Sequence, residues 1–332
     1  MTSVDLSIIV AVRNQFPHNQ LFLETLHRSS NVRTELVVVD NSSTDGSDEL
    51  FRRFGAQVIP TGENLCYPES MNLGLARARG EYVGFLNNDI VVSPGWDEGL
   101  MLALDKHRLP VISPIGIERS PTAELTRAVQ ERWRLVKRRI GPVETADDLR
   151  AALREMYGDW EAFCQRVKVT YKDRLVTGIV GSCVLARRTF MQAIGGWDTR
   201  VRAADWDLYL RLCERAHTMG DIRAPMIAGW IYVHHYVQAT RRGERTFFTC
   251  THPTVTVQEK WGEAAIRRWF FDPPLLTERP MLHRAPADYF RDRAKRLAID
   301  GRRGLALLGI LVRGFPDAEE LLAKVGQGGM GS

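Results

Sequence analysis

The chain has 332 residues, of which 44% are hydrophobic and 26% are charged, the composition of a soluble globular protein with a sizeable core. No segment approaches the roughly 18 consecutive apolar residues of a membrane-spanning helix, and the opening MTSVDLSIIVAV lacks the basic region of a signal peptide. Five cysteines without a CxxC pair favour neither a disulfide framework nor a zinc site. We therefore expect a cytoplasmic protein with reduced thiols.

The net charge of +5 is unevenly distributed along the chain. Residues 265–315 contain eleven Lys and Arg against five Asp and Glu. A basic segment of this kind can contact phosphates, nucleic acid or anionic lipid headgroups, and a solvated helix surface is the alternative. We expect packing against the main domain or peripheral contact with an anionic membrane, and we favour nucleic acid less as a partner.

The first third of the chain alternates between apolar runs and amphipathic segments. This alternation predicts right-handed βαβ units and a largely parallel sheet. The glycine-rich turns GxGxxG and GxxxxGK[ST] are missing from the sequence, which argues against a nicotinamide enzyme or a P-loop NTPase. The expected strands are residues 6–12, 35–39, 57–60 and 82–86, and the expected helices are residues 18–29 and the second half of 64–78.

The stretch GEYVGFLNNDI, residues 80–90, carries a buried strand directly into Asn87, Asn88 and Asp89. Open α/β sheets bind ligands beyond the carboxyl ends of their strands, so these side chains are placed to hold a metal or a sugar. Asp40 ends an earlier strand in the same way. A simple turn is the alternative, because Asn and Asp are ordinary turn residues.

The middle of the chain has helical composition. Residues 122–139 and 145–169 are rich in Leu, Ala, Arg and Glu, and Gly141 and Pro142 separate them. We expect an inserted helical hairpin beside the acceptor side of the site. Its function is either to shape acceptor choice or an oligomer contact, or purely structural.

A strand at residues 182–186 and a helix at 187–194 bring the chain to the sequence GGWD, and a second helix opens at ADWDLYLRL, residues 204–212. Asp205 lies near the amino end of that helix. Acidic residues in a first turn commonly cap a helix and complement its dipole, and from the residues alone capping is the favoured role.

Five segments, taken in order, resemble the family 2 glycosyltransferases of the GT-A fold. They are SIIVAVRN, LVVVDNSSTDGS, ENLCYPESMNLGLARARGEYVGFLNNDI, GSCVLARRTFMQAIGGWD and DWDLYLR, and the resemblance covers residues 4–112 and 176–240. It implies an α/β, GT-A-like (Rossmann-type), mostly parallel sheet sandwiched by helices. It also implies an inverting enzyme that uses a nucleoside diphosphate sugar and a divalent cation, Mn²⁺ or Mg²⁺.

The resemblance assigns the donor-binding residues one by one. Ala11 and Arg13 match positions that border the nucleotide base, and Asp40 matches the acid that hydrogen-bonds a uracil-like ring. Asn64 and Asn72 match positions that line the nucleotide pocket. The resemblance therefore favours a UDP or TDP sugar.

The resemblance also implies a metal site. Asp89 matches the last acid of the DXD-type motif, whose carboxylate binds the metal, while Asn87 replaces the first acid and Asn88 lies between them. His235 matches a histidine that completes the metal site, and we prefer it to His234. A single carboxylate remains adequate, because Mg²⁺ and Mn²⁺ often bind through one or two carboxylates plus substrate phosphates.

On the acceptor side, the resemblance places the turn of Gly196, Trp197 and Asp198 beneath the acceptor. Trp197 or Trp206 is a candidate for stacking on an apolar sugar face, and burial in the core is the alternative for each.

The resemblance makes Asp205 the candidate general base, which takes the proton of the acceptor hydroxyl during inverting transfer. We assign Asp207 a structural role. The family often has Glu where this chain has Ala204, which leaves the exact geometry of the base open.

We predict a metal-dependent inverting glycosyltransferase acting on the hydroxyl of a glycan or glycoconjugate. The alternatives are a catalytically impaired nucleotide-sugar-binding module, suggested by Asn87 and Ala204, and transfer to a nucleic-acid or protein acceptor. The expected organisation is a glycosyltransferase domain, 1–262 (nucleotide-sugar half 1–112, helical insertion 116–170, acceptor half 175–250), a basic helical extension, 263–325, and a disordered tail, 326–332.

Overall fold

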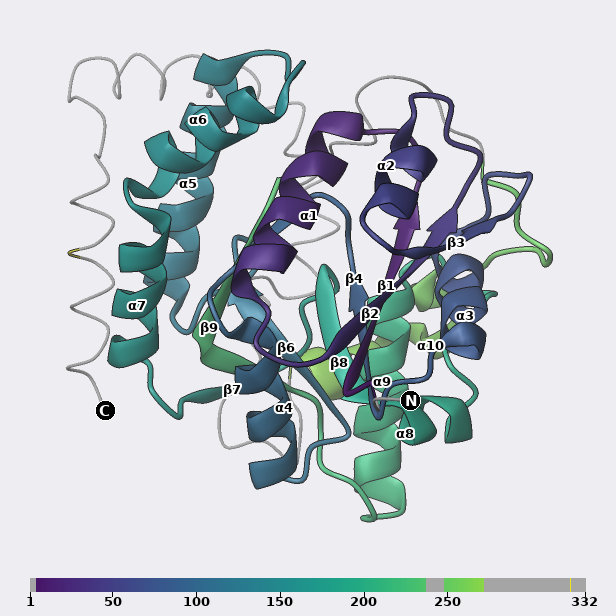
Figure 1. Ribbon diagram of the computed structural model, residues 1–332. Helices are drawn as coiled ribbons and strands as arrows, with labels where there is room; N and C mark the ends of the chain where they lie inside the picture. The colour runs from purple at the N-terminus through teal and green to yellow at the C-terminus, as the bar shows by residue number, and fades with distance from the viewer. Residues whose placement is uncertain (1–3, 237–247, 272–322, 324–332) are drawn as a thin grey trace, which may run out of the picture.

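The computed structural model describes residues 4–236, 248–271 and 323, and every statement below concerns these residues. A twisted central sheet has helices on both faces, and a separate group of helices lies beside one end of it (Figure 1). The fold is therefore of the mixed α/β class.

The described part of the chain forms a nine-stranded sheet. Eight strands follow the order β3-β2-β1-β4-β8-β6-β9-β5, and β7 pairs with β9 off this path. The strands are β1 (Leu6–Val12), β2 (Thr34–Asp40), β3 (Gln57–Pro60), β4 (Tyr82–Leu86), β5 (Ile90–Val92), β6 (Val111–Gly116), β7 (Leu175–Thr177), β8 (Cys183–Arg187) and β9 (Met226–His235).

The relative direction of neighbouring strands changes halfway across the sheet. β1 is parallel to β2 and to β4, and β2 is parallel to β3, as the alternation of strands and helices predicts. β8 is antiparallel to both β4 and β6, and β5 and β7 are antiparallel to β9. β6 and β9 are parallel. The expectation of a mostly parallel sheet therefore holds from β3 to β4, whereas the second half is mixed, because there the connections are not simple βαβ crossovers.

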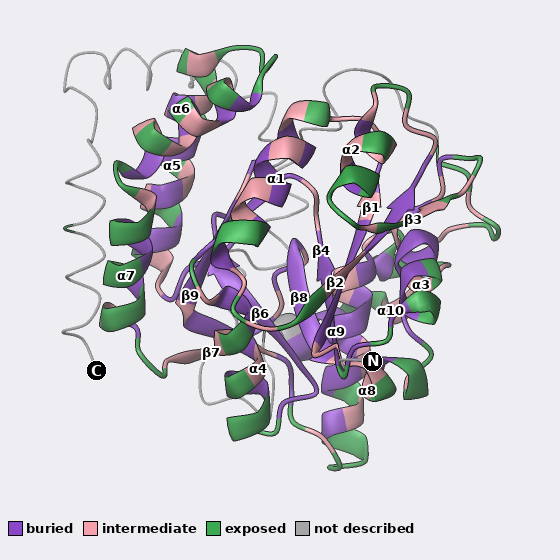
Figure 2. Ribbon diagram, in the orientation of Figure 1, coloured by how far each residue is buried: buried purple, intermediate pink, exposed green. Residues whose placement is uncertain are grey.

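One face of the sheet is covered by α1 (Phe16–Ser29), α2 (Ser47–Arg53) and α4 (Trp96–Lys106). Phe22, Leu23 and Leu26 meet on one side of α1, as their spacing predicts, and pack with alternate residues of β1. Figure 2 shows the central strands buried and the outer surfaces of these helices exposed.

The other face is covered by α3 (Tyr67–Arg77), α8 (Arg188–Ala193) and α9 (Ala204–Thr218). Successive side chains of β1 point to opposite faces of the sheet. Ile9 therefore packs in this second core, whereas Ile8 and Val10 pack in the first. Two further elements, α10 (Val257–Ile266) and the π-helical turn η1 (Arg267–Phe271), pack against α9.

The insertion after β6 contains three helices, where we expected a hairpin of two. They are α5 (Ala123–Ile140), α6 (Ala146–Tyr157) and α7 (Trp160–Thr170). The extra break follows from Gly158, which has a positive φ of 71°, and from Asp159, which caps α7 by accepting a 2.8 Å hydrogen bond from the Ala162 amide. Their apolar sides form a separate core with β9, β5 and α1.

The predictions for the basic segment fall mostly outside the described residues. These include its membrane contact, its helices and the disordered tail at 326–332. None of the described helices combines the length and the apolar character needed to cross a membrane.

Candidate active site

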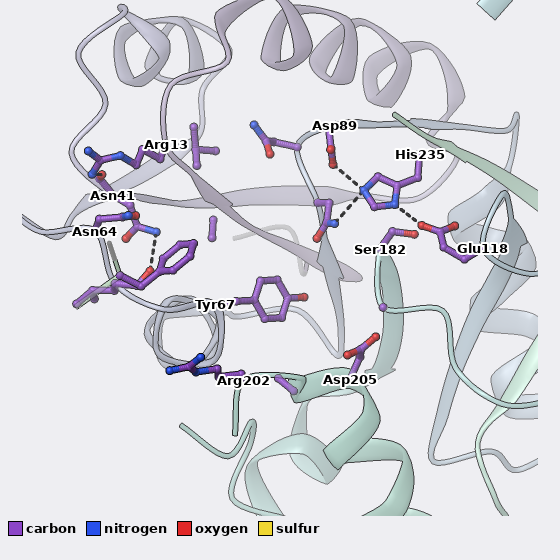
Figure 3. Close-up of a pocket in the computed structure, with 18 residues that line it drawn as sticks. Arg13, Asn41, Asn64, Tyr67, Asp89, Glu118, Ser182, Arg202, Asp205 and His235 are labelled. Atoms are coloured by element: carbon purple, nitrogen blue, oxygen red, sulfur yellow. Dashed lines mark hydrogen bonds and ion pairs between the residues drawn. The ribbon is translucent and has the colours of Figure 1, made fainter. Parts of the chain in front are cut away.

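A cavity of about 510 Å³ opens beyond the carboxyl ends of β1, β2 and β4, where the strand-end polar residues lead us to expect a site. The amino end of α9 and the end of β9 complete its walls (Figure 3). The lining residues are Ala11, Val12, Arg13, Asn41, Asn64, Leu65, Tyr67, Asn87, Asn88, Asp89, Glu118, Gly181, Ser182, Arg202, Ala204, Asp205, His235 and Phe248.

The end of β1 and the loop after β3 form the side of the cavity predicted to receive the nucleotide. Ala11, Arg13 and Asn64 line it, and the Arg13 guanidinium donates a 3.2 Å hydrogen bond to the Asn41 carbonyl. This wall therefore offers amide and guanidinium groups beside the small Ala11 side chain.

Asp40 does not line the cavity itself. It is buried at the end of β2, paired in register with Val12, which does line the cavity, and its carboxylate accepts a 3.2 Å hydrogen bond from the Ser43 amide. Its predicted contact with the nucleotide base stays a prediction.

Asp89 and His235 meet at the opposite wall. The His235 Nε2 atom lies 3.0 Å from Asp89 Oδ1, and the Asn87 side-chain amide lies 3.3 Å from the same nitrogen. On its other side, His235 Nδ1 contacts the Glu118 carboxylate (Figure 3). An imidazole thus lies between two carboxylates, with only 13% of its side chain exposed.

The electrostatics of this group follow from burial and charge together. Burial lowers the pKa of His235, but the Asp89 and Glu118 carboxylates outweigh burial and hold this pKa well above its ordinary value. Burial also raises the pKa of Asp89, and the charge and hydrogen bond of His235 reverse that effect, so the net shift is downward. Asp89 is therefore held as a carboxylate.

Asn87 and Asn88 hold the loop in place after β4. The Asn87 amide donates to the Ser182 carbonyl at 2.9 Å, and the Asn88 side chain donates to Asn19 at 2.7 Å. Both residues also line the cavity. The strand end is therefore fixed by β8 on one side and by α1 on the other.

Asp205 enters the same cavity from the first turn of α9, across from Asp89 (Figure 3). Burial raises its pKa, its helix-end backbone amides act in the opposite direction, and the charge of Glu118 adds to the rise. Within the described residues, Asp205 has no ion pair. The backbone of Gly181 lies so close that a Cβ atom there would be 2.4 Å from Asp205 Oδ2.

Tyr67 contributes a hydroxyl group to the cavity wall. The hydroxyl is buried and has no hydrogen-bond partner among the described residues, and burial followed by the charge of Asp205 raises its pKa beyond the ordinary range. A buried hydroxyl without a partner is costly, so this group is available to a substrate.

Two predicted site residues instead join structural elements. The Asn72 side chain donates to the Trp197 carbonyl at 2.8 Å and accepts from the Trp197 amide at 2.9 Å, so its amide group is used inside the protein. The Trp197 indole is buried, with edge-to-face contacts to Tyr67 and Phe85. Neither residue lines the cavity, and Trp197 has no free face for stacking on a sugar.

Three other residues predicted on the acceptor side also lie outside the cavity lining. Gly196 has the expected positive φ, 68°, but the group closest to it is the Asn72 side chain. Asp198 pairs with Arg200 and Lys260, both at 2.8 Å, and Trp206 packs between α9 and α10.

Asp207 has the structural role that we assigned to it. Its buried carboxylate pairs with Arg211 at 3.0 Å and with Lys260 at 2.5 Å, and it accepts a 2.8 Å hydrogen bond from the Trp261 indole. These contacts tie α9 to α10, away from the cavity.

Several lining residues were not predicted from the sequence. Glu118 follows β6, Gly181 and Ser182 precede β8, and Arg202 precedes α9. Phe248 lies beside Thr249, which pairs by backbone hydrogen bonds with Asn64 and Cys66. The polar residues among them follow or precede strands and helices as Asp89 does, a signal that could have identified Glu118 and Ser182.

The sequence profile described as Glycosyl transferase family 2 matches residues 7–195, more than half of the chain. The chain belongs to glycosyl transferase family 2. It is a glycosyltransferase, and the expected GT-A fold is confirmed.

This family 2 glycosyltransferase is similar to named relatives and solved structures. It is 23% identical to the N-acetylglucosaminyl-diphospho-decaprenol L-rhamnosyltransferase of Mycobacterium tuberculosis, across 91% of this chain and 100% of the relative. The mannosyltransferase of Pyrobaculum calidifontis, solved with GDP-Man and Mn²⁺, is 18% identical with a TM-score of 0.46, across 73% of this chain and 59% of that one. TarS of S. aureus with UDP is 14% identical with a TM-score of 0.44, across 70% and 60%.

Proposed function

We propose that this glycosyltransferase is a metal-dependent inverting enzyme that moves a sugar from a nucleoside diphosphate sugar, of the UDP or TDP type, to an acceptor hydroxyl. The observation that supports the proposal is that Asp89 and Asp205 line opposite walls of one cavity. One carboxylate has a lowered pKa beside a histidine, and the other has a raised pKa and no ion pair within the described residues. Titratable groups with opposite displacements mark different chemical roles.

The donor is proposed to lie along the wall that β1 and β2 provide. Arg13, Asn41 and Asn64 would bind the nucleoside there, since all three line the same side of the cavity. The diphosphate would then extend toward Asp89, and the transferred sugar would lie between Asp89 and Asp205.

The residues present fit a divalent cation. The Asp89 carboxylate is the kind of oxygen ligand that Mn²⁺ and Mg²⁺ prefer, and the His235 Nε2 nitrogen, 3.0 Å from it, would be a further ligand. Within the described residues, no three His, Cys, Asp or Glu side chains are grouped to hold a metal by themselves, so the diphosphate would supply further ligands. When bound, the cation would offset the negative charge that develops on the leaving diphosphate.

Asp205 is proposed to accept the proton of the attacking hydroxyl. Its pKa, raised by burial, makes it a better proton acceptor than an ordinary aspartate. The close approach of Gly181 fixes the carboxylate on one side. Tyr67, whose hydroxyl has no hydrogen-bond partner in the described part of the chain, would hydrogen-bond the substrate beside it.

The acceptor is proposed to be a glycan or glycoconjugate. The M. tuberculosis relative is named for transfer of L-rhamnose to N-acetylglucosaminyl-diphospho-decaprenol, and this chain spans its entire length. A lipid-linked diphosphate sugar is therefore the first acceptor to try.

The test uses purified protein with UDP, TDP and GDP sugars, each with MnCl₂, MgCl₂ or a chelator, and with a lipid-linked diphosphate sugar as acceptor. We expect metal-dependent release of the nucleoside diphosphate from at least one donor. Failure of every donor to bind or react would contradict the proposal. Donor binding without product on any acceptor would instead indicate a nucleotide-sugar-binding module.

A further inference from the structure

The helical insertion supplies a side chain to the proposed metal site. Glu118 lies in the six-residue loop between β6 and α5, the point at which the insertion begins. Its carboxylate contacts His235 Nδ1, on the side of the imidazole away from Asp89. The inference developed below rests on the proposed metal dependence.

The sheet register explains why Glu118 and His235 meet. β6 and β9 run parallel, with Gly116 opposite Val233. β9 continues for two residues past Val233 to His235, and Glu118 lies in the turn just after β6 ends at Gly116, so both residues are at the same end of this strand pair. Gly116 has no room for a side chain, since a Cβ atom there would lie 2.7 Å from the Val233 carbonyl oxygen and 3.1 Å from Glu118 Oε2.

The loop that carries Glu118 is held by the insertion. The Gly116 amide donates to the Arg119 carbonyl at 2.7 Å, which closes a tight turn around Glu118. The Gln130 side chain on α5 donates to the Ile117 carbonyl at 3.2 Å, and Thr126 accepts from the Ser120 amide at 3.0 Å. Helix α5 therefore fixes the backbone on which Glu118 sits.

The insertion also holds both neighbours of His235. Tyr157 hydrogen-bonds His234 Nδ1 at 2.9 Å, and Trp133 packs edge-to-face on the same ring with centroids 4.7 Å apart. Tyr236 donates its hydroxyl to the Leu149 carbonyl at 2.8 Å. The alternation of side chains along a strand then directs His235 away from the insertion core and into the cavity.

We propose that Glu118 is a positioning residue for the metal: it accepts the Nδ1 proton of His235 and so presents Nε2 to Asp89 and to a divalent cation, which would displace the proton that Nε2 shares with Asp89 in the metal-free protein. The insertion that delivers Glu118 is thereby part of the metal site. Histidines that bind metals usually donate their second nitrogen to a carboxylate or carbonyl, which fixes the tautomer and increases the basicity of the ligating nitrogen. Replacing such a partner costs about 10-fold to 100-fold in metal affinity.

The test measures Mn²⁺ affinity by isothermal titration and by the EPR signal of free Mn²⁺, with saturating UDP, TDP or GDP present and no sugar transfer required. Glu118→Ala is expected to weaken Mn²⁺ binding about 10-fold to 100-fold. Glu118→Gln keeps an oxygen that accepts the Nδ1 proton and should recover part of the loss. Glu131→Ala, at an exposed position on α5, is the matched control and should bind Mn²⁺ like the wild type.

A double-mutant cycle tests whether Glu118 acts through His235. Glu118→Ala should add nothing to the loss caused by His235→Ala, because the histidine it orients is already gone. Additive losses, equal losses in Glu118→Gln and Glu118→Ala, or unchanged affinity in Glu118→Ala would each overturn the inference. Wild-type protein that binds no Mn²⁺ with any of the nucleotides would instead contradict the proposed metal dependence. Circular dichroism confirms that each variant is folded.

Discussion

The two aspartates that face each other across the cavity differ in everything around the carboxylate. Asp89 follows a buried strand, is 6% exposed, and has a histidine at 3.0 Å. Asp205 lies in the first turn of α9 with the Gly181 backbone against it, and burial, with a smaller contribution from the charge of Glu118, raises its pKa. The same side chain is thus kept ionised at one wall and made more basic at the other.

This difference arises because the end of β4 and the start of α9 have different structural neighbours. The end of β4 lies next to β8 and faces the end of β9, so Asp89 gains a partner from a distant strand. At the start of α9, backbone amides act on the Asp205 carboxylate, and the Gly181 backbone lies against it. The first arrangement suits a fixed charge, and the second suits a group that gains and loses a proton.

The largest expected effect comes from removing the charge at Asp205. Asp205→Asn should lower transfer by about 10²-fold to 10⁴-fold, the usual contribution of a general base, while donor binding stays unchanged. Transfer rates and nucleotide titrations on the same preparation measure both quantities. Transfer at the wild-type rate would show that Asp205 is not the general base. It would also contradict the different roles that we assign to Asp89 and Asp205.

Removing the charge at Asp89 should give the opposite pattern. Asp89→Asn should abolish the metal-dependent part of nucleotide affinity, a loss of about 100-fold or more, because a direct ligand matters at least as much as its supporting partners. The measurement is nucleoside diphosphate binding with Mn²⁺ and with a chelator. The variant and the wild type should agree in chelator, and a difference there would point to a role other than metal binding.

The substitution Gly181→Ala tests whether the position of the Asp205 carboxylate matters, without changing any charge. The Cβ of Gly181→Ala would meet Asp205 Oδ2 at 2.4 Å and displace the carboxylate, and misplacement of this size costs about 100-fold in rate. Donor affinity should change little. Gly55→Ala, which meets nothing within 4 Å but has a φ of +78°, is the control and should cost about 1 kcal/mol of stability without lowering transfer.

The smallest expected effect is on stability and its pH dependence. Because the folded-state pKa of Asp205 lies above the ordinary value of 3.8, its stabilising contribution is complete below that value and is lost as pH rises through the folded-state pKa. Asp205→Asn, always neutral, should therefore unfold with a higher free energy than the wild type at neutral pH, and the difference should vanish in acid. Urea unfolding at a series of pH values measures this, and a constant difference would contradict the raised pKa.

Much of the fold could be predicted from local pattern. The apolar runs at β1, β2 and β4 and the polar residues after them predicted strands and a strand-end site, and the cavity lies there. The antiparallel placement of β8 between β4 and β6 could not be predicted, because the alternation of elements does not fix strand order across a long insertion. The third helix of the insertion depends on Gly158 and Asp159, a break that we did not weigh.

The predictions for the site were most accurate for side chains that follow a strand. They were least accurate for side chains that could either bind a ligand or pack inside the protein. Asn72 and Trp197 have side chains suited to a nucleotide and a sugar. However, the Asn72 side chain is hydrogen-bonded to the Trp197 backbone, and the Trp197 indole is buried in the core. Glu118 was missed for the reverse reason. It follows the end of β6, but the sequence does not show that β6 and β9 are neighbours, and that pairing brings it to His235.

That shared register has an evolutionary consequence. The three helices beyond Ala123 can vary in sequence and length, provided that their apolar sides still cover the end of β9. The turn from Gly116 to Arg119 has less freedom, because it is closed by the hydrogen bond between the Gly116 amide and the Arg119 carbonyl and carries the carboxylate that contacts His235. We therefore expect sequence drift to be tolerated in the three helices and resisted at Gly116 and Glu118.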